Sequence, residues 1–67
     1  MNGGAGMKYR INGREATKAE AREAIRAAVP NGGVEFLENT IRNGRREELE
    51  SVTIHIGQKQ NVEIVFR

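Results

Sequence analysis

The chain has 67 residues, with 11 Lys or Arg against 9 Asp or Glu and a net charge of +2, so its length allows one small domain and excludes a second. Cysteine is absent, which excludes disulfides and thiolate metal sites as sources of stability. No apolar run reaches the roughly 18 residues that span a bilayer, and the N-terminus lacks the basic and apolar stretches of a signal peptide, so we expect a cytoplasmic protein with no membrane partner.

The chain opens with a tail, a strand and a turn. Residues 1–6 include three glycines and predict a flexible tail, which leaves residues 7–67 as the single domain. Residues 7–11 alternate between apolar and polar side chains, which is the period of a half-buried strand. The Asn12-Gly13 dipeptide suits a type I′ turn, so Arg14 to Ala16 are expected to fold back briefly on the first strand.

The clearest pattern predicts a helix from Lys18 to Val29. Thr17 and Glu20 have the spacing of a capping box, in which each side chain binds the other residue's backbone N–H. The apolar stripe of this helix follows at helical spacing and consists of Ala21, Ala24, Ile25, Ala28 and Val29. A stripe this rich in alanine favours close packing. Proline and two glycines in residues 30–33 end the helix.

A second helix is predicted from Val34 to Arg42. Val34, Leu37 and Ile41 repeat at helical spacing, and Asn43-Gly44 is typical of a helix end. The alternative carries this helix through Gly44 to Leu49. We favour the break, because an interior glycine costs about 1 kcal/mol relative to alanine.

From Ser51 the period returns to two residues and predicts a β-hairpin. Val52, Ile54 and Ile56 face one side of the first strand, and Val62, Ile64 and Phe66 face the same side of the second. A loop from Gly57 to Asn61 would place Ile56 near Val62 and Ile54 near Ile64.

These elements predict a two-layer α+β domain in the order strand, helix, helix, strand, strand. Val, Ile, Leu and Phe number 15, which is enough for a thin core. We expect a three-stranded, mainly antiparallel sheet with both helices on one face.

The residue types that carry catalysis are sparse. His55 is the only histidine, there is no aspartate, and His55 falls on the solvent face of its strand. Glu47, Glu48 and Glu50 adjoin arginines and indicate a solvated charge cluster. A domain of this size has little room for an enclosed pocket. We therefore expect a non-enzymatic protein without a metal or cofactor.

Arginine outnumbers lysine eight to three, and its guanidinium binds phosphates or carboxylates in bidentate fashion. Arg42, Arg45 and Arg46 gather at the end of the second helix. A second group is predicted to project from the sheet face opposite the helices and consists of Lys8, Arg10, His55 and Arg67. Three interpretations are open, namely a solvated face, a surface for a protein partner and a nucleic-acid surface. The predicted partner-binding residues are Arg10, His55, Arg67, Arg42, Arg45 and Arg46.

A small sheet also leaves edges that can pair with another chain. The apolar Val65 falls on the outer sheet face. We expect a homodimer, with a monomer as the alternative.

The stretch from Tyr9 to Glu20 resembles the opening of short accessory proteins of bacteriophages and mobile elements, in which a strand, an Asn-Gly turn and a capped helix follow the start. The resemblance covers twelve residues and carries no site residue across. It implies a protein that binds a bacterial host factor, including defence inhibitors of the anti-CRISPR kind, by covering a surface. The alternatives are a nucleic-acid-binding regulator that uses the same arginines on phosphates, and a designed or purely structural domain.

Overall fold

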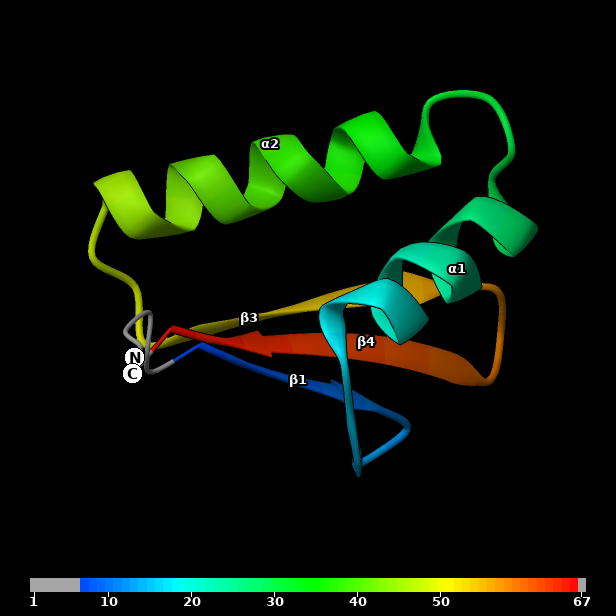
Figure 1. The fold of residues 1–67 in the computed structure, drawn as a ribbon, viewed down its shortest axis with the longest axis horizontal. Coiled ribbons are helices and arrows are strands. Elements are labelled where there is room, and N and C mark those ends of the chain that lie inside the picture. The colour runs from blue at the N-terminus through cyan, green and yellow to red at the C-terminus, as the bar shows by residue number, and fades with distance from the viewer. Residues whose placement is uncertain (1–6, 67) are drawn as a thin grey trace.

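The computed structural model describes residues 7–66 and has two layers, a sheet and a pair of helices (Figure 1). The elements in chain order are β1 (Lys8–Ile11), β2 (Arg14–Ala16), α1 (Lys18–Ala28), α2 (Gly33–Arg46), β3 (Ser51–Ile56) and β4 (Gln60–Val65). All strand pairs are antiparallel, in the order β2-β1-β4-β3. The α+β class is confirmed, and the predicted count of three strands is wrong by one.

The additional strand is β2. Asn12 and Gly13 have φ values of 53° and 83°, the left-handed pair that a type I′ turn requires. This turn sends Arg14–Ala16 back along β1, with Ala16 opposite Tyr9. The predicted return of the chain is confirmed. Arg14–Ala16 form a strand because the two-residue turn fixes how they pair with β1.

Both helices lie on one face of the sheet, as predicted (Figure 1). The capping box that begins α1 is formed, since the Glu20 N–H donates to Thr17 Oγ1 at 3.0 Å and the Thr17 N–H donates to Glu20 Oε1 at 2.8 Å. Helix α1 ends at Ala28, and Val29 is its C-cap. The predicted helix is therefore confirmed to within one residue.

Helix α2 continues past its predicted end at Arg42 and runs to Arg46. Gly44 is buried inside the helix, where an added Cβ would overlap the ring of Phe66. The close approach of Phe66 explains why this position is a glycine and why the helix does not break there. The helix ends instead in a Schellman motif, in which Leu49 N–H donates to Gly44 O at 2.9 Å and Glu48 N–H to Arg45 O at 3.2 Å.

The hairpin of β3 and β4 is confirmed, and its predicted register is wrong by two residues. Ile54 pairs with Val62 and Val52 with Ile64. The turn is shorter than expected, because Gly57 takes a φ of 70° and lets Gln60 pair with Ile56. A shift of two residues keeps every side chain on its expected face.

One core joins the two helices to the sheet. Its buried members are Tyr9, Ala21, Ile25, Leu37, Ile41, Ile54, Ile56, Val62 and Ile64. They come from both helices and three strands, so the helix layer and the sheet share one interior. Within residues 7–66, neither helix combines the length and the apolar surface that a membrane span requires.

Candidate interaction surfaces

Arg10 and His55 lie on the open face of the sheet, as predicted, and both have partners there. Arg10 Nη1 is 3.3 Å from Glu63 Oε1 on the neighbouring strand β4. His55 Nδ1 is 2.7 Å from the Asn61 side-chain oxygen. Arg67 lies outside the described residues.

The open face is charge-balanced. Glu15 is opposite Arg10 on β2, and Glu63 is opposite it on β4. Lys8 is the second cation on this face, so two cations stand against two carboxylates among the described strand positions. No phenylalanine, tyrosine or tryptophan of these strands points this way, since Tyr9 is buried in the core. This face therefore offers neither a strong field nor a stacking platform for a nucleic acid.

The arginines of α2 belong to the other layer of the molecule. Arg42 donates to the Asn39 side-chain oxygen at 3.3 Å, and Arg46 donates to that of Asn43 at 3.0 Å. Because α2 covers the opposite face of the sheet from Arg10 and His55 (Figure 1), the described site residues lie in the two separate groups that the sequence predicts.

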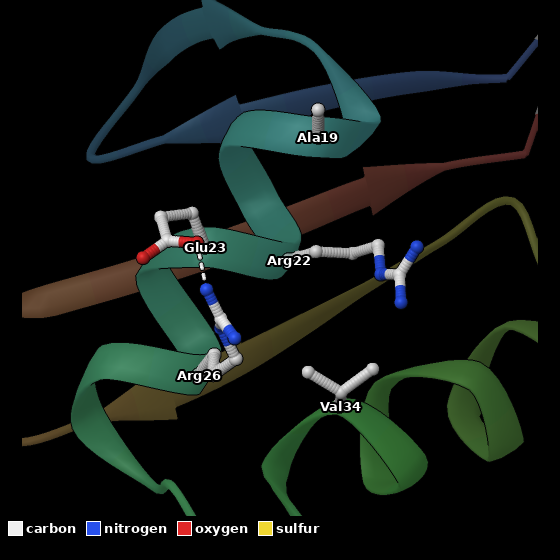
Figure 2. A pocket seen from close by; sticks show the side chains of 5 residues that line it. All are labelled: Ala19, Arg22, Glu23, Arg26 and Val34. Carbon is white, nitrogen blue, oxygen red and sulfur yellow. Dashed lines mark hydrogen bonds and ion pairs between the residues drawn. The ribbon is translucent and has the colours of Figure 1, made fainter.

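A hollow of about 250 Å³ lies between the two helices (Figure 2). Figure 2 shows Arg22 extending away from α1 and Val34 projecting from α2 toward α1. Arg26 donates to Glu23 at 3.1 Å. The residues that line this hollow are Ala19, Arg22, Glu23, Arg26 and Val34.

A second hollow, of about 310 Å³, lies between the same two helices. Glu38 lines the second hollow, and its carboxylate lies 3.6 Å from Lys18 Nζ in the same hollow and 3.9 Å from Nε of Arg22, which lines the first. The residues that line this second hollow are Lys18, Glu38, Ile41, Arg42 and Arg45. We call the two hollows together the α1–α2 groove.

The α1–α2 groove is cationic. Five Lys or Arg side chains and two Glu side chains line it, so it carries three net positive charges, more than the +2 of the whole chain. Arg42 and Arg45 were predicted as binding residues. Lys18, Arg22 and Arg26 were not, because the charges of α1 alternate in sign along the sequence. Their spacing of four residues, which places all three in one row of the helix, is the signal that identifies them.

Two residues of the groove, Glu38 and Arg45, act electrostatically on the buried Tyr9. Burial raises the pKa of its hydroxyl, the Glu38 carboxylate raises that pKa further, and the Arg45 guanidinium opposes the shift. The Tyr9 hydroxyl therefore ionises only at a pH above its usual range. Glu38 and Arg45, which come from the same helix, thus both act on a side chain of the sheet.

Among residues 7–66, no three side chains of the metal-binding types gather in one place. The cations of the groove can form ion pairs with anionic groups. No known protein family, curated protein or solved structure matches this chain.

Proposed function

We propose that this chain is a small, non-catalytic binding protein whose α1–α2 groove holds an acidic segment of a protein partner. The observation that supports the proposal is the excess of cations along the groove, five against two carboxylates. Guanidinium groups bind carboxylates in bidentate geometry. The groove thus has the chemistry to receive more carboxylates than the chain itself supplies.

Glu38 shows how such a carboxylate would be held. Its carboxylate lies between two cations of α1, 3.6 Å from Lys18 Nζ and 3.9 Å from Arg22 Nε. Ala19 and Val34 add apolar surface beside these charges. A partner segment that alternates acidic and apolar residues would satisfy both parts of the groove.

The resemblance of the opening segment to phage accessory proteins extends the proposal to a class of partner. On this interpretation the protein acts in the bacterial cytoplasm and covers an acidic surface of a host or defence factor. Inhibition would then come from occlusion of that surface.

A nucleic-acid ligand is the second candidate. Lys18, Arg22 and Arg26 recur every four residues, which is about 6 Å along a helix and comparable to the separation of successive phosphates on one strand. The charge-balanced sheet face weighs against this candidate, because it adds no further cations to the field.

The test compares two labelled probes, a peptide of alternating Glu and Leu and a single-stranded oligonucleotide of equal charge. We expect the peptide to bind and Arg22→Glu or Arg45→Glu to weaken that binding at least about tenfold, which corresponds to about 1.4 kcal/mol. Arg14→Glu is the matched control, since it makes the same charge change on β2, outside the groove.

Equal loss with Arg14→Glu would overturn the groove as the site. Salt separates the two ligands, because binding of a nucleic acid falls by orders of magnitude between about 50 and 200 mM. Stronger binding of the oligonucleotide than of the peptide, with that salt dependence, would favour the second candidate.

A further inference from the structure

The two edges of the sheet differ in how well they are protected. Edge strands usually avoid pairing with other chains by being short or by carrying charges or proline. β2 has three residues, and two of them, Arg14 and Glu15, are charged. β3 has six residues, Ser51–Ile56, with no Lys, Arg, Glu or Pro among them. The β3 edge therefore has neither the short length nor the charge or proline that protects edge strands.

The hydrogen bonds identify the groups that β3 presents at this edge. Asn61 directs its backbone toward Asn12, with bonds of 2.8 and 2.9 Å, and Phe66 N–H donates to Glu50 O at 2.8 Å. Because backbone direction alternates along an antiparallel ladder, Val52 and Ile54 face β4. The N–H and C=O groups of Ser51, Thr53 and His55 point outward, and no strand within residues 7–66 pairs with them.

We propose that the β3 edge pairs, antiparallel, with the β3 edge of a second copy of this chain. In the centred register Thr53 lies opposite Thr53 of the second copy, and Ser51 lies opposite His55. All three positions direct their backbone groups outward, so each pair can exchange hydrogen bonds. The register places no like charges opposite each other, which would oppose pairing.

The ends of the edge have opposite charge. Three exposed glutamates, Glu47, Glu48 and Glu50, come before β3, and the exposed Lys59 follows it. Antiparallel pairing places the acidic end of one copy beside the Lys59 end of the other. A parallel arrangement would bring the two acidic ends together. The charges thus favour the two-fold arrangement.

Two large, exposed apolar side chains lie near opposite ends of β3. Phe36 is 56% exposed and Leu49 is 40% exposed. The first turn of α2, which carries Phe36, lies at the end of the sheet where the β3–β4 hairpin turns, whereas Leu49 comes just before the start of β3 (Figure 1). Antiparallel pairing brings the Phe36 end of one copy to the Leu49 end of the other.

Phe36 also lies on the flank of α2 that is nearer to the β3 edge, as the positions of α1 and Glu38 show. Glu38 pairs with cations of α1, so its flank of α2 faces α1. A two-residue step turns the helix by about 200°, which puts Phe36 on the flank away from α1. α1 packs against β1, and β3 is at the far edge of the sheet from β2. The Phe36 flank is therefore on the β3 side.

The test is the mass in solution by sedimentation, from about 1 to about 500 µM. The wild-type chain is expected to shift from its mass of 7.5 kDa to twice that value as concentration rises. Thr53→Pro removes an N–H that points outward and spares the β4 ladder, so we expect it to weaken the dimer at least about tenfold. Thr53→Lys keeps that N–H and places two ammonium groups at the two-fold axis, with the same expected result.

Glu15→Pro is the matched control, because Glu15 also directs its N–H outward, at the β2 edge. It should leave dimerisation unchanged. A wild-type monomer at the highest concentration, or a dimer that survives both Thr53 variants while circular dichroism shows them folded, would overturn the proposal. The result does not depend on the α1–α2 groove, so Arg22→Glu should still dimerise.

Discussion

At the scale of single residues, Glu48 is in a conformation that its side chain disfavours. Its φ is 57°, and a left-handed residue with a Cβ costs about 1–2 kcal/mol. The position is C′ of α2, where glycine is usual. We expect Glu48→Gly to be more stable than Glu48→Ala by about 1 kcal/mol, because both variants remove the same side chain and only glycine relieves the strain. Urea unfolding of the two variants measures the difference.

The neighbouring residue provides the control. Glu47 has a φ of −91°, which any residue adopts, so Glu47→Gly gains no relief and loses about 0.5–1 kcal/mol relative to Glu47→Ala. Opposite signs at the two positions are the expected signature. The same sign at both would mean that backbone strain does not distinguish them.

At the scale of elements, the sequence predicts what local periodicity and turn chemistry determine. α1 follows from its capping box and apolar stripe, and the β1–β2 reversal follows from Asn12-Gly13. The end of α2 does not follow from local signals. Gly44 is disfavoured in an isolated helix, but a contact with Phe66, 22 positions further along the chain, requires a glycine there. Local propensity therefore gave the wrong helix end.

The candidate site shows the same division. Arg42 and Arg45 could be found from the sequence as a cluster at a helix end. Their separation from Arg10 follows from the predicted two layers, whereas their position beside Arg22 depends on how α1 and α2 pack against each other. The i, i+4 spacing of Lys18, Arg22 and Arg26 is present in the sequence, but the sequence does not show that this row lies opposite Arg42 and Arg45.

Gly44→Ala tests the helix–sheet contact. The substitution gains about 1 kcal/mol of helix propensity, but its Cβ would overlap the Phe66 ring, and overpacking costs about 1–3 kcal/mol. We expect a net loss of stability in chemical denaturation.

The contact is isolated by a double-mutant cycle. In the background of Phe66→Ala the ring is gone, so Gly44→Ala should stabilise the protein by up to about 1 kcal/mol. A destabilising effect of the same size in both backgrounds would show that Phe66 is not the reason for the glycine.

At the scale of the whole molecule, the two proposed surfaces use different parts of the fold. The α1–α2 groove lies between the helices, and the β3 edge lies at one side of the sheet. A two-fold axis through Thr53 would leave both copies' helices on the same side of one continuous sheet. Such a dimer would present two grooves to one partner, which raises avidity without any new contact.

Both surfaces depend on one thin core, and Leu37 tests how much stability that core supplies. Leu37 is fully buried, and Leu→Ala substitutions at such sites cost about 2–5 kcal/mol. A domain of this length is stable by only about 3–10 kcal/mol in total. We therefore expect Leu37→Ala to lose a large fraction of its unfolding free energy in one cooperative transition.

The adjacent Phe36→Ala is the control, because Phe36 is largely exposed and its removal should cost less than about 0.5 kcal/mol at concentrations where the chain is monomeric. Equal losses at the two positions would contradict the packing of α2, since one helix cannot bury both flanks equally against the same sheet.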